Sequence, residues 1–274
     1  MNITRVCAVF FSPTGHTRQA VRLLAGGMAA VLGAAVDEID FTLPAGRAET
    51  YAFGSGDLVV LGVPVYAGRV PNKLLPFLRT GLQGGGALAV PVVTFGNRSF
   101  DDALSELRSE LIQDGFQPFA AAALACGHAF SDRVAPGRPD ETDLAAWERF
   151  AADAGARAAA LTGPPAPVAV PGRNPVGPYY TPLGTDGAPA VFLKAKPETD
   201  REKCTRCGLC ARLCPMGSIS PEDPAQVPGV CIKCQACVRC CPAGAKYFSD
   251  PAFLSHVAML ERSFSRRAEP SFFL

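Results

Sequence analysis

The first 161 residues alternate between short apolar runs and longer stretches whose apolar positions recur at helical spacing. Two of the runs, residues 6–11 and 58–63 (LVVLGV), are apolar throughout, which is typical of strands buried on both faces. Five strands are predicted in all, at residues 6–11, 36–41, 58–63, 88–95 and 118–125.

Helices are expected between and after these strands. Pro71 is expected to open the second helix in its first turn, where the missing N–H costs nothing. Gly115 is expected to stop the third. Alternating strands and helices predict the α/β class, with a doubly wound, five-stranded parallel sheet of flavodoxin type in the order 2-1-3-4-5. The four helices are predicted at residues 17–32, 71–79, 101–113 and 144–161.

Residues 162–196 differ from both flanks because they contain eight prolines. Proline removes a backbone donor and cannot extend a helix or a central strand, so an extended, semi-rigid linker is expected. Its apolar positions Tyr179, Tyr180 and 191–193 indicate that it is packed rather than free. The chain is accordingly divided into residues 1–161, 162–196, 197–250 and 251–274.

The last of these segments is expected to be an amphipathic helix followed by a tail. Phe253, Val257, Leu260 and Phe264 recur at i, i+4, i+7 and i+11, which places them on one helix face. The apolar residues 272–274 are expected to pack against the fold, and a partner-binding tail is the alternative.

Eight of the eleven cysteines form one pattern, C-x2-C-x2-C-x3-C-P, which is written twice with an offset of 27 residues. Three thiolates at these intervals surround one cluster, and the fourth ligates the other cluster. The pattern therefore predicts a small α+β ferredoxin domain of the bacterial type with two 4Fe–4S clusters and crossed ligands. One cluster takes Cys204, Cys207, Cys210 and Cys241, and the other takes Cys231, Cys234, Cys237 and Cys214.

A zinc site and a disulfide framework are the two other interpretations of the cysteines. Zinc sites commonly use paired C-x2-C units, to which these longer runs are a poor match. A disulfide framework is disfavoured by the expected compartment. Outside the repeats, Cys7 is expected to be a buried small hydrophobe, and Cys240 a residue near the second cluster that is not a ligand.

Composition agrees with a cytoplasmic redox protein. The 274 residues are 48% hydrophobic and carry a net charge of +1, which argues against a disordered chain and against nucleic-acid binding by charge. We expect no secretory segment and no membrane span. Basic side chains between the cysteines are expected to raise the cluster potentials or to dock an acidic partner. They are Lys203, Arg206, Arg212, Lys233 and Arg239.

The turn after the first predicted strand has the composition of an anion site. Residues 11–17 read FSPTGHT, so hydroxyl side chains and a glycine lead directly into a helix, whose N-terminal N–H groups favour a phosphate. There is no lysine of the Walker type. An ordinary N-capped helix is the alternative. The loop resembles the phosphate loop of flavodoxins (T/S-x-T-G-x-T), and this resemblance assigns the FMN phosphate to Ser12, Thr14, Gly15 and Thr17. His16, which stands where Asn is usual, departs from the pattern and is a further FMN-site candidate.

Two further strand-end loops, residues 64–71 and 94–102, are expected to hold the flavin ring at the carboxyl edge of the sheet. Tyr66 is expected to stack on the ring, and Asn97 and Arg98 to bond its carbonyls. Turn glycines and solvent-facing arginines are the alternative. Trp147 is expected in the core. The ring-site candidates are Pro64, Tyr66, Gly68, Arg69, Thr94, Gly96, Asn97 and Arg98.

A third loop follows the fifth strand at residues 126–140, also on the ligand side of the sheet. His128 in this loop is a candidate proton relay near flavin or cluster, although a loop histidine without such a role is the commoner case.

The whole chain resembles the flavodoxin–ferredoxin fusion family, on the motifs SPTGHT, PVYAGRVP, GNRSFDDAL and the double cysteine run. The resemblance implies FMN, two 4Fe–4S clusters and electron transfer with redox protein partners; it does not give the oligomeric state. An FMN-dependent oxidoreductase acting on a small molecule is the alternative function. No G-x-G-x-x-G follows a predicted strand, and no general acid–base pair is evident, so we expect an electron carrier.

Overall fold

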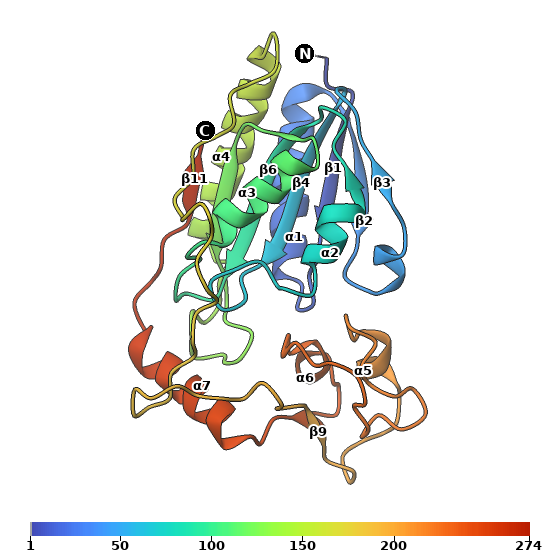
Figure 1. The fold of residues 1–274 in the computed structure, drawn as a ribbon, viewed down its shortest axis with the longest axis vertical. Coiled ribbons are helices and arrows are strands. Elements are labelled where there is room, and N and C mark those ends of the chain that lie inside the picture. Colours follow the sequence, from blue (N-terminus) through green and yellow to red (C-terminus); the bar gives the residue numbers. More distant parts are fainter. Residues whose placement is uncertain (1) are drawn as a thin grey trace.

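The computed structural model describes residues 2–274 and has two parts, an α/β domain and a cysteine-rich segment that lies beneath the carboxyl ends of its strands (Figure 1). All neighbouring pairs among the five long strands are parallel. Their order is 2-1-3-4-5, as the sequence predicts. Across the sheet they are β2 (Ala35–Asp40), β1 (Arg5–Phe10), β4 (Asp57–Pro64), β6 (Leu88–Phe95) and β8 (Ala121–Ala125).

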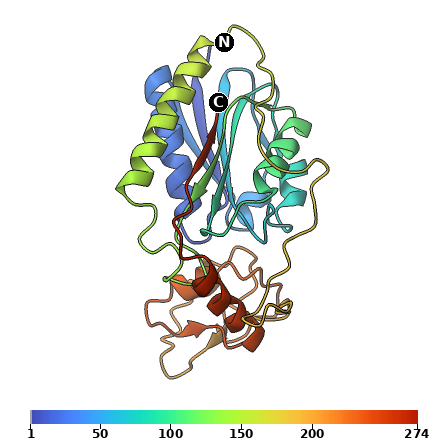
Figure 2. The same ribbon diagram turned by 90° about the vertical axis from the view of Figure 1, so that its left-hand side faces the viewer.

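Helices cover both faces of the sheet (Figure 2). One face carries α1 (His16–Leu32) and α4 (Glu141–Ala160), and the other carries α2 (Leu75–Thr80) and α3 (Ala103–Gln113). Successive strand residues point to opposite faces, and both sets are buried in separate apolar clusters. Trp147 on α4 is fully buried in one of them, which confirms its expected packing role.

Glycines let the two helices on the first face approach closely. A Cβ at Gly27 of α1 would lie 2.7 Å from the Cβ of Ala151 on α4, and a Cβ at Gly155 would lie 2.9 Å from Val31. Both positions therefore require a residue without a side chain. This contact fixes α1, and with it the loop that precedes α1.

Some boundaries differ from the sequence predictions. The second helix begins at Leu75 rather than Pro71, because Pro76 cannot donate to a preceding turn and is tolerated only at a helix start. The fifth strand is interrupted: β7 (Gln117–Pro118) pairs with the beginning of β6, and β8 pairs with its end. A 3₁₀ turn, η1 (Ala45–Arg47), and a parallel pair of β3 (Tyr51–Ala52) and β5 (Leu82–Gln83) were not predicted.

The proline-rich segment runs down the side of the α/β domain toward the cysteine-rich segment (Figure 2). Its backbone is held at several points. Val168 N–H donates to Pro118 O at 2.8 Å, Tyr180 N–H donates to Ala67 O at 2.8 Å, and the Tyr179 hydroxyl donates to Val70 O at 2.8 Å. The segment is therefore packed along its length.

The cysteine-rich segment repeats its backbone as well as its sequence. The short helices α5 (Leu209–Arg212) and α6 (Ala236–Arg239) occupy equivalent places in the two copies. Three pairs of equivalent residues have left-handed φ: Arg206 and Lys233 (55° and 56°), Gly208 and Gln235 (70° and 66°), and Gly217 and Gly244 (59° and 58°). The two-stranded sheet of β9 (Glu198–Thr199) and β10 (Lys246–Tyr247) closes the segment.

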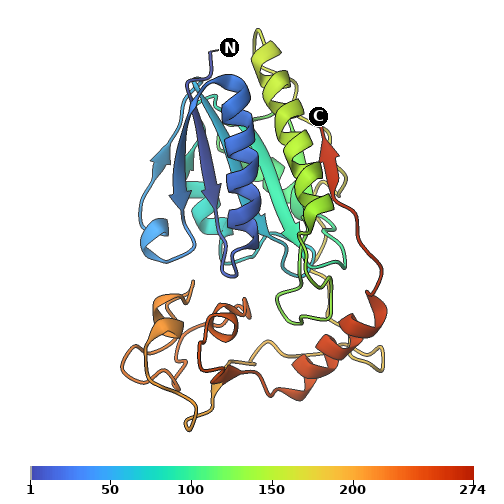
Figure 3. The same cartoon turned by 180° about the vertical axis from the view of Figure 1, so that it is seen from behind.

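The chain then returns to the α/β domain. The helix α7 (Pro251–Ser263) lies beneath the domain, and the following tail climbs its edge (Figure 3). There β11 (Ser271–Phe273) pairs antiparallel with β8, so the long sheet gains an edge strand that the sequence did not predict. Among residues 2–274, no helix has both the length and the apolar character that crossing a membrane requires.

Candidate functional site

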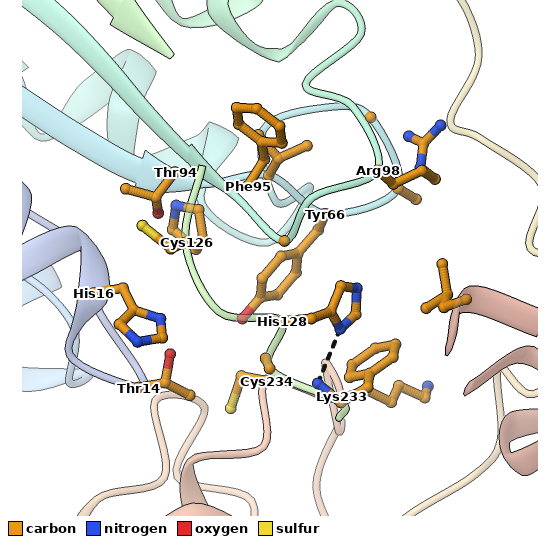
Figure 4. A pocket seen from close by; sticks show the side chains of 18 of the residues that line it. Thr14, His16, Tyr66, Thr94, Phe95, Arg98, Cys126, His128, Lys233 and Cys234 are labelled. Carbon is orange, nitrogen blue, oxygen red and sulfur yellow. Dashed lines mark hydrogen bonds between the residues drawn. The ribbon is translucent and has the colours of Figure 1, made fainter. Parts of the chain in front are cut away.

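A cavity of about 240 Å³ lies where the carboxyl ends of the strands face the cysteine-rich segment (Figure 4). Small-molecule pockets span roughly 300–1,000 Å³, so this cavity is slightly smaller than that range. Four strand-end loops of the α/β domain form one wall. The opposite wall consists of Tyr180, Pro182, Phe192, Ile232, Lys233, Cys234, His256 and Leu260.

The loop between β1 and α1 forms one end of this cavity. The N-cap of α1 is Gly15, with φ 98° and no side chain of its own to cap the helix, but a Ser12 hydroxyl bond to the first turn is of the kind that the capping alternative expects. Ser12 Oγ accepts from Arg18 N–H at 2.9 Å, and the Thr17 and Thr94 hydroxyls are 2.7 Å apart. An open concavity adjoins the same turn, lined by Thr14, Gly15, His16, Arg18, Gln19 and Arg22.

The thirteen residues predicted for FMN fall into two groups. Ser12, Gly15, Arg69 and Asn97 do not line the cavity, although Gly15 lines the adjoining concavity. The other nine do line it, which brings together three loops that are distant in sequence. They are Thr14, His16, Thr17, Pro64, Tyr66, Gly68, Thr94, Gly96 and Arg98.

The polar groups of the Arg69 and Asn97 side chains are already bound to other residues of this chain. The Arg69 guanidinium forms a nearly buried, two-pronged ion pair with Glu106 and lies 4.8 Å from the ring centroid of Tyr179. Asn97 is only 1% exposed, and its amide donates to the carbonyls of Phe264 and Arg266. The expectation that these two side chains contact the flavin is therefore corrected: both hold other parts of this chain in place.

Tyr66 and Arg98 line the cavity, and Tyr66 is the one of the two whose polar group has no ion-pair partner within residues 2–274. The Tyr66 ring projects across the space toward the cysteine-rich segment (Figure 4), and burial, with the nearby Cys234 and Cys231, raises the pKa of its hydroxyl. Arg98 pairs with Asp101, and its guanidinium lies 4.1 Å from the ring centroid of Tyr180.

All three histidines of the chain line the cavity: His16, His128 and His256. Burial is the main cause that lowers the pKa of each, and for His128 the value falls to about 4. His128 Nδ1 accepts from Phe130 N–H at 3.1 Å, so a second proton on the ring would oppose this donor. The neutral ring therefore carries its proton on Nε2.

The neighbourhood of His128 is tightly packed. A Cβ at Gly96 would lie 2.3 Å from the His128 ring, so the loops after β6 and β8 approach each other only because residue 96 is glycine. His256 on α7 donates from Nδ1 to Leu183 O at 2.9 Å and stacks on Phe192 at 5.5 Å. Sequence reasoning did not assign His256 or Phe192 to the site; the apolar run at 191–193 was the available signal.

The eight repeat cysteines surround two separate cavities. Each cavity combines three cysteines of one copy with the fourth of the other copy, which is the crossed grouping that the sequence predicts. Among residues 2–274, no three His, Cys, Asp or Glu side chains are arranged to hold a single metal ion. The first group is Cys204, Cys207, Cys210 and Cys241, and the second is Cys214, Cys231, Cys234 and Cys237.

These groups fit iron–sulfur clusters in their chemistry. Burial raises the pKa of Cys234 to about 12 and that of Cys237 further, so thiolates there need a bound cation. Backbone N–H groups already point at two sulfurs in equivalent places: Ser218 donates to Cys214 Sγ at 3.3 Å, and Ala245 donates to Cys241 Sγ at 3.2 Å. Such bonds stabilise cluster thiolates.

The remaining cysteines are not members of either group. Cys7 is buried, as expected, and its pKa rises to about 11 through burial. Cys240 was expected near the second cluster, but its charged neighbours are Cys210, Cys241 and Cys207. It therefore lies beside the first group without being one of its members, because the adjacent Cys241 belongs to that group.

Two arginines join the cysteine-rich segment to the α/β domain. Arg239 donates to the carbonyls of His128 (3.0 Å) and Ala129 (3.1 Å) and pairs with Asp132. Arg47 in η1 donates to the carbonyl of Pro215. The cavity is thus closed by contacts that fix one part against the other.

Comparison with known families and structures covers both parts. Residues 197–220 and 228–244 each match a family model described as a 4Fe-4S binding domain. Together with the 2-1-3-4-5 sheet, these matches decide the architecture. The chain joins a flavodoxin-like α/β domain to two 4Fe-4S binding segments. No curated protein sequence matches it.

Solved structures resemble the flavodoxin-like part of this fusion only weakly. Oxidised flavodoxin 2 from Bacillus cereus is 16% identical with a TM-score of 0.41 and covers 57% of this chain and 99% of its own. A flavodoxin from the domain Archaea is 12% identical with a TM-score of 0.38 and covers 56% and 98%. The rubredoxin oxygen:oxidoreductase from Desulfovibrio gigas is 15% identical with a TM-score of 0.38 and covers 58% and 38%. The function of the fusion has to be argued from its own site.

Proposed function

We propose that this iron–sulfur flavoprotein transfers single electrons between two 4Fe–4S clusters and FMN, and that it exchanges them with other redox proteins. The observation that carries the proposal is the position of Cys234. This residue lines the cavity at the carboxyl ends of the strands and also belongs to the second cysteine group. A flavin in that cavity and a cluster on those thiols would share one wall.

The α/β domain supplies the groups that FMN needs. The start of α1 at its N-cap Gly15, with Thr14 beside it, offers N–H and hydroxyl donors to a phosphate. The cavity walls supply an aromatic ring at Tyr66 and apolar surface at Val65, Phe95 and Ile232. These residues bind and orient, and the docked cysteine-rich segment excludes water from the far side.

The bound groups complement each other in electron count. FMN holds one or two electrons and each 4Fe–4S cluster exchanges one, so together they convert between single electrons and pairs. The protein would keep the flavin and the second cluster close together, because Tyr66 reaches across the cavity to the side where Cys231 and Cys234 lie. Burial of these thiols keeps the exchange out of solvent.

Anaerobic reductive titration tests this function. Purified protein should contain about eight irons and one FMN, and the visible and EPR signals of flavin and clusters should equilibrate on mixing. Cys240→Ser, outside both cysteine groups, is the control and should titrate like the wild type. Irons without FMN, or a flavin and clusters that do not exchange electrons, would contradict the proposal.

A second candidate function is an FMN-dependent oxidoreductase acting on a small molecule. The observation that favours it is the presence of His128 in the cavity, since the free Nε2–H of its neutral ring could donate a hydrogen bond to a carbonyl oxygen of the small molecule and polarise it. Anaerobic turnover of p-benzoquinone faster than by free FMN, and lost in His128→Gln at unchanged FMN content, would support the enzyme. Equal turnover by the wild type and His128→Gln would favour the electron-carrier function over the enzyme.

A further inference from the structure

The two cysteine groups differ in their position in the molecule. The second group adjoins the flavodoxin-like domain through Cys234, as described above. The cavity of the first group is lined only by residues of the cysteine-rich segment, between Thr199 and Lys246. Its Cys207 is exposed to solvent, in contrast to the buried Cys237 of the second group. The first group is therefore the one that another molecule can approach.

The repeat supplies a template for that approach. In the second copy, Lys233 and Arg239 carry out the internal docking: Lys233 donates to Leu193 O, and Arg239 donates to two loop carbonyls and pairs with Asp132. Their equivalents 27 residues earlier are Arg206 and Arg212. The same two positions thus carry cationic side chains on both copies.

In the first copy these cations face solvent. Arg206 is exposed and, within residues 2–274, has no ion-pair or hydrogen-bond partner. Arg212 donates to Cys207 O at 2.9 Å, which holds its guanidinium beside the exposed cysteine. Leu213, which follows Arg212 in the sequence, is 38% exposed. We call Arg206, Cys207, Arg212 and Leu213 the outer face.

The other charges near the outer face largely cancel. Arg201 pairs with Asp223 at 3.3 Å, and Lys203 pairs with Asp200 at 2.8 Å. Within residues 200–213, Glu202 is the one acidic side chain without an ion-pair partner. The unpaired charge is therefore positive around Cys207.

We propose that the outer face is the electron port of this protein and that it docks a redox protein with an acidic surface. A carboxylate of the partner would meet Arg206 and Arg212 as Asp132 meets Arg239 in the second copy. One electron passes between the first cluster and the partner's metal or flavin, one being oxidised as the other is reduced, and no bond or proton needs to move. This inference rests on the proposed function for the onward path to FMN.

The test uses two small acceptors of opposite charge. Dithionite-reduced protein, freed of excess reductant, is mixed in a stopped-flow instrument with an acidic rubredoxin or with basic cytochrome c, and the visible absorbance of the acceptor is followed. At low ionic strength the rate with rubredoxin should exceed that with cytochrome c and should fall as salt is added. Electrostatic steering changes such rates by about 10- to 1,000-fold.

Charge reversal locates the port. Arg206→Glu with Arg212→Glu should lower the rubredoxin rate by about tenfold or more and raise the cytochrome c rate. Arg206→Glu alone is the cleaner variant, because this side chain forms no ion pair or hydrogen bond within residues 2–274. The matched control is Arg149→Glu with Arg157→Glu on exposed positions of α4, which changes the net charge equally and should leave both rates within about twofold.

Two outcomes would overturn the proposal. One is an outer-face variant that matches the α4 control with rubredoxin while its iron content and EPR signals match the wild type. The other is a wild-type rate with rubredoxin that does not respond to salt. Failure of the proposed function is seen separately, because a flavin that never equilibrates with the clusters still leaves the rubredoxin rate measurable.

Discussion

Residues 5–161 and residues 197–250 differ in what fills their interiors. In the flavodoxin-like domain, apolar side chains on both faces of one sheet form two large, fully buried clusters. In the cysteine-rich segment, one of the small clusters consists of Ile219 with the ligand candidates Cys210 and Cys237. The first domain is thus stabilised by apolar burial, and the second by whatever its thiols bind. The predictions below test this difference.

Loss of one cluster ligand is expected to have the largest effect. Cys237→Ser should remove about four of about eight irons, because the buried site loses a ligand. Hydrogen exchange should then show loss of protection in residues 197–250 and near-native protection in the sheet. Cys240→Ser is the control and should retain iron. Equal loss of protection in both parts would contradict the comparison.

Truncating a side chain in the apolar core is expected to destabilise the flavodoxin-like domain and to leave the iron content unchanged. Leu61 in β4 is fully buried, so Leu61→Ala should lower the free energy of unfolding of the flavodoxin-like domain by about 2–5 kcal/mol. Denaturant titration followed by far-UV circular dichroism measures this change, with the iron content unchanged before unfolding. Val36→Ala, at a half-exposed position of β2, should cost less than about 1 kcal/mol. If Leu61→Ala lost iron without unfolding, the stability of the cysteine-rich segment would depend on the apolar core of the flavodoxin-like domain, which would contradict the comparison.

Lowering the pH should reduce the free energy of unfolding through His128, which lies where the flavodoxin-like domain faces the cysteine-rich segment. The folded pKa of His128 is about 4, below its ordinary value of 6.5, so between these values the unfolded chain binds more protons. The stabilisation from the neutral ring is therefore complete above about pH 6.5 and is lost as the pH falls toward 4. One group with this shift contributes at most about 3 kcal/mol. His16 and His256, whose pKa values are also lowered, act in the same direction.

His128→Gln separates this effect from general acid denaturation. The free energy of unfolding of the wild type should fall more steeply between pH 6.5 and 4 than that of the variant, measured by denaturant titration at each pH. Parallel pH profiles would show that His128 is not held neutral by the docked segment.

The smallest effect is expected at the tail. Asn97→Ala removes two donated hydrogen bonds and one accepted from Ala268 N–H at 3.0 Å, at a cost of about 1–3 kcal/mol. Hydrogen exchange should show faster opening of residues 264–273, while the cluster signals stay unchanged. Arg266→Ala is the control, since Asn97 contacts only the backbone carbonyl of Arg266. Unchanged tail protection in Asn97→Ala would mean that β11 alone holds the tail.

The sequence predicted the features that depend on local pattern. The strand order follows from alternating buried strands and helices, and the crossed cysteine groups follow from the spacing of the repeat. The second helix begins later than Pro71 predicts because Pro76 lies in its first turn. Both residues suit a first turn, but only one of them can lie there.

Other parts of the site depend on contacts between distant segments, which a single sequence does not display. Asn97 lies in a loop rich in candidate ligands, yet its amide is satisfied by residues 264–268. His256 lies on a helix whose apolar spacing was recognised, but its place in the cavity depends on how α7 and the linker cross beneath the sheet. Cys240 lies beside the first group rather than the second because its neighbour Cys241, the fourth cysteine of the second copy, belongs to the first group.

The pairing of β11 with β8 has a consequence for biosynthesis. Residues 271–273 are translated after both cysteine runs, so the nascent flavodoxin-like sheet keeps the edge of β8 open until the cysteine-rich segment has left the ribosome. An open edge strand invites pairing with other chains. Completion of the sheet therefore follows synthesis of the whole iron–sulfur segment, and a chain truncated before residue 271 carries an unprotected edge that cellular quality control can recognise.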